Sequence, residues 1–477
     1  MGKTKRTDME DRISELPELV LSSILSKLPP KDIIRTGVLS KAWKQHRELI
    51  EYKLDLHLLN LLESKYTNGL RRHYHLYDHG SKVYNYKHFL EVRREFMNRV
   101  DKVLHHFKSS KITSLKVTCF LDSGNSSDID CWINSAIAFG VEELQLLCSN
   151  DVASIITTAG FYKFPYWFFK QSFLRHLKLE RCILTPTSDF TGFSKLLTLS
   201  LRQVRLCKDF CDSLFTNCSL LQELTLDFCD IPVSSVLRIV SASLQQLSLL
   251  NNYTTNLSMN VEIYAVNLFS FTYTSFIEAT TVLFHTPSLA NFCFDVLDRD
   301  TTCLLSQVAT LPSLEILSFF HYPCQPPYLD KLSFQFGNLK QLKLVYDEYG
   351  RTVLEYFTWL FDILQACPVL KKFQISFLDR SSPNNKEEIG NLCGYTYKTL
   401  KEMKMTGSTG NWNEIELILF ILKNAIALER VIIEPSLDLY NGKDLVPREG
   451  KSSESVHETF RRSLQNKIPH GVELVIR

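Results

Sequence analysis

The chain of 477 residues lacks the features that mark several large classes of protein. No apolar run reaches the roughly 18 to 20 residues that a membrane-spanning helix needs, and the first residues lack the apolar core of a signal peptide. A formal net charge of only +2 provides no general attraction to nucleic acid or to acidic membranes. We therefore expect no nucleic acid and no membrane as partners, and a location in the nucleus, the cytoplasm or both.

Motifs for catalysis and metal binding are also missing. The sequence contains no glycine-rich phosphate loop, no nucleophile elbow and no HExxH pair, so we expect no enzyme and no cofactor. A cysteine nucleophile with a distant histidine base stays open, because such partners need not be adjacent in the sequence, but no feature favours it.

The 13 cysteines are odd in number and irregularly spaced, which favours reduced thiols over a disulfide framework. Two clusters have spacings that could contact a metal: His73, His75 and His79, and Cys207, Cys211 and Cys218. The histidines are flanked by polar residues typical of a solvated loop, and a buried helix face accounts for the cysteines equally well. Structural zinc needs four well-placed ligands, so we expect no metal site.

One pattern does recur along the chain: an apolar residue, two others, an apolar residue, one other, and an apolar residue. Its copies begin at Leu174, Leu196, Leu221, Leu244, Leu268, Leu289, Leu314 and Leu339, with looser ones at Leu370, Leu400 and Leu428 and earlier ones at Ile112 and Val141. From Leu174 to Leu339 the steps are 22, 25, 23, 24, 21, 25 and 25 residues. These steps lie within the range of about 20 to 29 residues that is typical of leucine-rich repeats.

The second and third apolar residues of each copy share parity, so they point to one side of a short strand. One repeat buries almost nothing alone, whereas stacked repeats share a continuous core. Between the strands we predict helices, for example over 233–242 and 352–367. The fold class is therefore an α/β repeat: a curved solenoid with parallel strands inside and helices outside, over residues 111–385.

The N-terminal stretch "LPELVLSSILSKLPPKD", residues 16–32, predicts a short apolar helix that ends at a double proline. Pro17 suits the first helical position, because its missing N–H has no partner there in any helix. Two further short helices complete a segment that is too small to bury its own apolar surface. The rest of the chain or another protein must cover it.

Residues 13–45 resemble an F-box, through the combination of Leu16-Pro17, Ile24-Leu25, Leu28-Pro29, Val38-Leu39-Ser40 and Trp43. The resemblance implies that residues 11–50 bind a Skp-family adaptor and, through it, a cullin. The residues that match adaptor-facing or core positions are Leu16, Pro17, Ile24, Leu28, Pro29, Leu39 and Trp43. The alternative for this segment is an N-terminal cap on the solenoid.

Three segments complete the organisation of the chain. Residues 1–10 are predicted to be a disordered basic tail, and 51–110 a helical connector whose apolar stripe over 88–107 caps the first repeat. Residues 386–477 are similar to the FBD-like C-terminal repeats and cap of plant F-box/leucine-rich-repeat proteins. The strand, turn, helix and strand of 397–435 would close the array, with an edge strand over 467–477.

Two aromatic stretches, 160–170 and 319–330, have two interpretations. They are either anchors for a partner at the rim of the solenoid or packing between its layers, and packing is favoured. The resemblance implies a non-catalytic receptor subunit of a ubiquitin ligase whose solenoid binds an unknown protein substrate. The alternative is a cullin-independent scaffold or ligand-sensing repeat protein.

Overall fold

The computed structural model describes residues 16–28, 32, 51–63, 66, 86–108, 110–148, 160–165, 167–168, 173–185, 193–207, 210–231, 236–251, 260–275, 282–296, 301–321, 334–346, 353–377, 396–435, 439–440, 445–446 and 453–477. The chain divides into two compact units, Met1–Pro232 (unit 1) and Val233–Arg477 (unit 2). No helix within the described ranges is long and apolar enough to cross a membrane.

Unit 1 is built on parallel strands that pair in the order β1-β2-β3-β5-β7-β9. Their bounds are β1 (Glu51–His57), β2 (Lys111–Thr118), β3 (Glu143–Leu147), β5 (His176–Glu180), β7 (Thr198–Arg202) and β9 (Glu223–Asp227). A second ladder joins β4 (Tyr162–Lys163), β6 (Cys182–Leu184) and β8 (Arg205–Leu206). The helices are α1 (Glu18–Ser26), α4 (Leu58–Leu61), α6 (Tyr86–His106), η1 (Ser123–Asn125), α7 (Ser126–Phe139) and α8 (Phe210–Asn217).

Unit 2 continues the same design with parallel strands in the order β11-β13-β15-β16-β17-β18-β19-β20-β23. Their bounds are β11 (Gln246–Leu250), β13 (Ser270–Ser275), β15 (Asn291–Val296), β16 (Ile316–His321), β17 (Gln341–Tyr346), β18 (Lys372–Phe377), β19 (Glu402–Thr406), β20 (Arg430–Glu434) and β23 (Glu473–Ile476). Smaller sheets pair β10 (Val236–Val240), β12 (Asn260–Tyr264) and β14 (Val282–His285), and β21 (Leu439–Tyr440) with β22 (Leu445–Val446).

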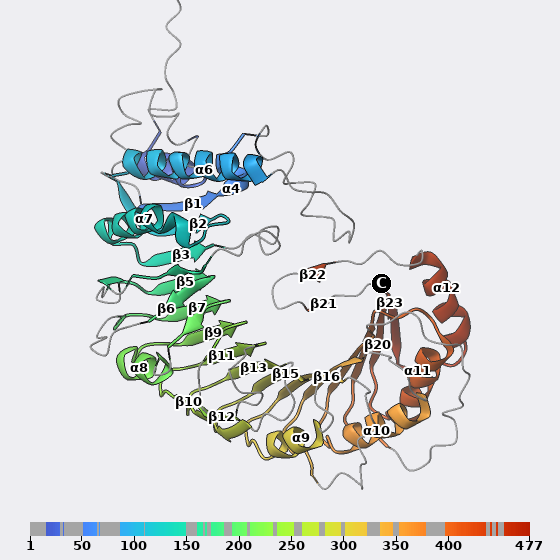
Figure 1. The fold of residues 1–477 in the computed structure, drawn as a ribbon. Helices are drawn as coiled ribbons and strands as arrows, with labels where there is room; N and C mark the ends of the chain where they lie inside the picture. Colours follow the sequence, from blue (N-terminus) through green and yellow to red (C-terminus); the bar gives the residue numbers. More distant parts are fainter. Residues whose placement is uncertain are drawn as a thin grey trace, which may run out of the picture. The chain divides into compact units, whose positions relative to one another are not determined.

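The helices of unit 2 are α9 (Thr301–Ala309), α10 (Val353–Gln365), α11 (Trp412–Asn424) and α12 (Ser453–Leu464). The strands of this unit follow an arc, and α9, α10 and α11 lie on its outer side (Figure 1). The predicted arrangement of inner parallel strands and outer helices is confirmed here, including the helix expected over 352–367 and the edge strand over 467–477.

The alternation of apolar and polar residues explains why each repeat forms a strand. In β5 the side chains of Leu177 and Leu179 are buried, whereas His176 and Lys178 on the other face are half-buried. Leu177 pairs in register with Leu144 of β3 and Leu199 of β7, so equivalent leucines of successive repeats lie side by side. The core of each unit is therefore a set of leucine rows that run across the strands.

Two segments differ from the predicted helices. Residues 236–240 form strand β10, which pairs with β12, so the helix predicted over 233–242 is wrong. Here Leu237 and Ile239 are buried while Arg238 and Val240 are exposed, a period of two that suits a half-buried strand. The segment 51–110, predicted to be a helical connector and N-terminal cap, begins with β1, which pairs along its whole length with β2. Helix α6 covers the predicted amphipathic stretch, with Val92, Phe96 and Val100 fully buried.

The turn before α11 is closed by a buried carboxylate. Glu414 accepts hydrogen bonds from the backbone N–H groups of Thr409, Gly410 and Asn411, at 3.0, 2.7 and 3.2 Å from its Oε2. Asn411 Oδ1 in turn accepts from the N–H of Glu414 at 2.9 Å, which completes a capping box. A Cβ atom at Gly410, where φ is +75°, would lie 3.3 Å from Thr459 Cγ2, so glycine lets α12 approach this turn.

We expect Glu414→Ala to lower the free energy of unfolding by about 1–3 kcal/mol, because it leaves the N–H donors of three half-buried residues without their acceptor. Glu416→Ala on the same helix is the control, since the half-buried Glu416 forms no hydrogen bond or ion pair with any described residue. The measurement is the midpoint of thermal unfolding of each full-length variant. Equal midpoints for the two variants would contradict the role given to Glu414.

The first residue after several repeat strands has a left-handed backbone. Arg181, Gln203, Phe228 and Asn251 follow β5, β7, β9 and β11, and their φ angles are 55°, 52°, 51° and 49°. The N–H of Gln203 donates to the carbonyl of Asp227 at 2.8 Å, and that of Arg181 to the carbonyl of Arg202 at 3.0 Å. The left-handed residue therefore extends the hydrogen-bonded ladder at the point where each strand turns away.

Gln203→Asn should raise the free energy of unfolding by up to about 1 kcal/mol, because asparagine tolerates a positive φ better than glutamine does. Gln222→Asn, at an exposed residue outside the left-handed set, should change it little. Chemical denaturation of both variants and the parent chain provides the comparison. An equal or larger gain at position 222 would show that backbone strain at Gln203 is not the cause.

Candidate functional surfaces

Helix α1 leaves apolar side chains uncovered. Leu21 has no exposed surface, and its helix packs against β1, whereas Leu19, Val20 and Ile24 are 84%, 42% and 37% exposed. The carbonyl of Pro17 accepts from the N–H groups of Val20 and Leu21 at 2.8 and 3.1 Å, so the helix begins one residue later than predicted. One side of α1 is thus anchored to the first strand of unit 1, and the other side is open to a partner.

The structure places only some of the predicted adaptor-binding residues. Pro17 and Ile24 are exposed, Leu16 and Leu28 are half-buried, and Pro29, Leu39 and Trp43 lie outside the described residues. The prediction omitted Leu19, the most exposed of the three apolar side chains. Helical spacing places Leu19 on the apolar stripe of the predicted helix. Only the contact of α1 with β1 decides which side of the helix is covered.

The face of the strands that points away from the buried leucine rows is called the outward face here. In unit 1 this face contains a shallow hollow of about 180 Å³. In the middle of this hollow, Lys178 lies in register between Gln145 and Ser200. His176 Nδ1 lies 2.8 Å from Thr198 Oγ1, and Gln145 Nε2 donates to Glu143 Oε1 at 2.5 Å. Hydroxyl, amide and charged groups therefore line this face, which suits binding rather than catalysis.

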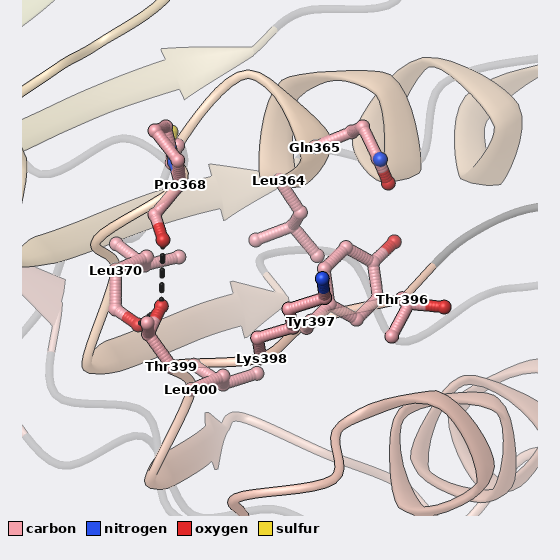
Figure 2. A pocket seen from close by; sticks show the side chains of 10 residues that line it. Leu364, Gln365, Pro368, Leu370, Thr396, Tyr397, Lys398, Thr399 and Leu400 are labelled. Carbon is pink, nitrogen blue, oxygen red and sulfur yellow. Dashed lines mark hydrogen bonds between the residues drawn. The ribbon is translucent and has the colours of Figure 1, made fainter.

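A second hollow, of about 200 Å³, lies in unit 2 beside the C-terminal end of α10. Its lining residues are Leu364, Gln365, Cys367, Pro368, Leu370, Thr396, Tyr397, Lys398, Thr399 and Leu400. Figure 2 shows the Thr399 hydroxyl directed at the Pro368 carbonyl, to which it donates at 3.0 Å. It also lies 2.9 Å from the carbonyl of Leu370, so this hydroxyl is used within the fold.

Six of the nine cysteines whose side chains the structure describes are buried, whereas Cys131 is exposed and Cys207 and Cys293 are half-buried. Burial raises the pKa of the Cys148 and Cys229 thiols to about 12, and it raises that of Cys182 well above its usual value. Thiolate is the reactive form, so these groups are protonated and inert near neutral pH. Cys182 and Cys229 each follow the last leucine of a repeat strand by three residues, at the turn after the strand, and neither side chain is exposed.

No group of histidine, cysteine and carboxylate side chains that could hold a metal occurs in the part of the chain that the structure describes. His73, His75 and His79 lie outside that part, as does the Cys211 side chain. Cys207 is half-buried and Cys218 buried.

The aromatic stretch 160–170 contributes to packing within the fold, which was the favoured of its two interpretations. Tyr162, Phe164 and Phe168 are at most 1% exposed, and the rings of Phe164 and Phe168 meet edge to face at 5.3 Å. In the stretch 319–330, Phe319 is buried and stacks on Phe294 at 5.1 Å. Residues 322–330 of this stretch lie outside the described ranges.

These features define a repeat protein with a helix that exposes apolar side chains ahead of its first strand. A family model described as "At1g61320/AtMIF1, LRR domain" matches residues 103–474, and the F-box domain model matches residues 13–46. The chain belongs to the At1g61320/AtMIF1 leucine-rich-repeat family and carries an F-box. An F-box implies binding to a Skp-family adaptor, and proteins that combine it with leucine-rich repeats generally act as non-catalytic substrate adaptors of ubiquitin ligases.

Curated relatives from Arabidopsis thaliana match along different lengths. The FBD-associated F-box protein At1g61320 is 25% identical over 509 aligned residues, covering 99% of this chain and 98% of the relative. The F-box/FBD/LRR-repeat protein At1g13570 is 26% identical over 90% of this chain and 92% of the relative. The match to F-box protein At5g03100, at 29% identity, spans 46% of this chain and just over half, 57%, of the relative. The predicted resemblance to plant F-box/leucine-rich-repeat proteins with an FBD module is confirmed.

We expect the buried thiols to resist alkylation in the native protein at pH 8, because their raised pKa values leave almost no thiolate. The exposed Cys131 should be modified, whereas Cys148, Cys182 and Cys229 should react only after unfolding. Mass spectrometry of iodoacetamide-treated protein, with and without denaturant, tests this. Rapid native labelling of Cys148 would contradict the burial that the structure assigns to it.

Proposed function

We propose that this protein is the substrate-recognition subunit of a Skp-cullin-F-box ubiquitin ligase. The supporting observation is α1, which lies inside the F-box match and carries the exposed side chains Leu19, Val20 and Ile24. Apolar side chains that lie together on one short helix are a typical anchor for a partner's groove. The adaptor would cover this side of α1 and connect the chain to a cullin.

The leucine-rich repeats then hold a target protein near the ligase. The chain itself contributes no reacting group in this proposal; it raises the effective concentration of the target and orients it. Because Leu21 is buried in the contact with β1, the adaptor-binding helix and the first repeat would move as one body. We further propose that the protein acts in the nucleus, the cytoplasm or both.

Leu19→Glu with Ile24→Glu should reduce binding to a purified Skp-family adaptor by more than about tenfold, because two carboxylates would be buried at an apolar interface. Val240→Glu is the matched control, since Val240 is an apolar side chain of unit 2 that is 53% exposed. Both full-length variants should keep the circular dichroism spectrum and unfolding midpoint of the parent. Affinity is measured by pull-down and by titration with the adaptor.

Loss of binding in the double variant alone would establish that α1 binds the adaptor. A folded parent chain that does not bind the adaptor, or a double variant that binds as well as the parent, would refute the proposal. A folded parent chain that does not bind the adaptor would favour a repeat scaffold that acts without a cullin.

A further inference from the structure

Ion pairs run across the outward face of the later strands in unit 2. The cations on β18, β19 and β20, and Arg477 after β23, each have an acidic partner on a neighbouring strand. The pairs are Lys372 with Glu402 at 3.3 Å, Lys404 with Glu434 at 2.7 Å, Arg430 with Glu473 at 2.7 Å and Arg477 with Glu434 at 3.5 Å. Pairing between adjacent strands is therefore the rule for cations at this end of the sheet.

Lys343 on β17 is the exception. It is half-buried, and in register its neighbours are Ser318 on β16 and Gln374 on β18. Neither neighbour carries a charge, and Lys343 forms no ion pair or hydrogen bond with any residue that the structure describes. A partly desolvated ammonium group without a counter-charge is unfavourable, and a carboxylate from outside the chain would relieve that cost.

Three apolar side chains lie near this lysine, on β16 and on its own strand. Ile316 and Phe320 flank Ser318 on β16, Val345 follows Lys343 on β17, and all three are half-buried on the outward face. The next pair along the sheet, β17 and β18, has only Val345 on this face. The corresponding residues of β11 and β13 are mostly hydroxyl and amide side chains, among them Gln246, Ser248, Ser270, Thr272 and Thr274.

This combination is typical of a protein-binding surface: apolar contact area beside one charged group that has no ion-pair partner among the described residues. Lys178 in unit 1 also has no ion pair within the described ranges, but Glu143 and Glu223 line the same hollow. Those carboxylates would repel an acidic ligand, whereas Asp295, the carboxylate that β15 presents on the face of Lys343, lies two strands away from it. The charges thus favour Lys343 as the place where an acidic partner binds.

We infer that the outward face of β16 and β17 binds a segment of the target protein in which an aspartate or glutamate lies beside an apolar residue. The carboxylate pairs with Lys343, and the apolar residue packs on Ile316, Phe320 and Val345. This inference rests on the proposed function, because it specifies the kind of target segment that the ligase subunit would hold.

The test is a random, unphosphorylated peptide library displayed on phage and selected on the full-length chain. We expect the selected peptides to be enriched in aspartate or glutamate next to Leu, Ile or Phe. Synthetic copies should bind Lys343→Gln about tenfold more weakly than the parent chain, a loss of about 1.4 kcal/mol. Lys178→Gln, the same change at the other lysine without a partner, should leave their affinity unchanged. Selection on Lys343→Glu should enrich lysine or arginine instead.

Several results would overturn the inference: recovery of no peptides, selected peptides without acidic enrichment, or equal binding by the parent and Lys343→Gln. An equal loss with Lys178→Gln would do the same. Adaptor affinity is measured for each variant in parallel. Normal adaptor binding together with a failed selection refutes this surface and leaves the proposed function standing, whereas absent adaptor binding by the parent refutes the proposed function itself.

Discussion

A single repeat of this chain leaves the two apolar positions of its strand exposed until the next strand packs beside it. Leu177 and Leu179 of β5 are covered because β3 and β7 lie in register on either side of them. Backbone hydrogen bonding obeys the same condition, since every parallel strand obtains its partners from other repeats. The structure therefore depends on the shared core between neighbours rather than on any repeat alone.

That dependence places special demands on the first and last described strands of the array. At the start, α4 packs on β1, and α6 packs on α4 and α7 with Val92, Phe96 and Val100 fully buried. The side chains of Arg93 and Asp122, 2.7 Å apart, connect α6 to the chain after β2. At the other end, α12 packs on α11, with Phe460 and Leu464 fully buried. The F-box helix α1 is thus attached to a structured end of unit 1, which suits a part that must position a second protein.

Side chains on the outward face of the strands need not be covered by the neighbouring repeats, unlike the leucines of the core. Its residues do not contribute to leucine packing, so their chemistry can serve binding. Cross-strand ion pairs such as Lys116 with Asp55 and Lys404 with Glu434 satisfy most charges on this face within the fold. Charged side chains that form no such ion pair with a described residue, above all Lys343, are those that could pair with a charged group of another protein. Under the proposed function, target recognition therefore concerns a small number of residues on this face.

The sequence by itself determined the repeat, its spacing and its apolar positions, because a period of two in short strands follows directly from side-chain geometry. It also identified the F-box, whose combination of residues is specific. It could not separate helix from strand at 236–240 and 51–57, because a run of about five apolar and polar residues suits either until a pairing strand is present. Only the tertiary structure decided which side of α1 faces β1, and which lysines have no ion-pair partner among the described residues. Both depend on contacts between residues some 30 positions apart, such as Lys404 with Glu434, and strand register sets the contacts within the sheet.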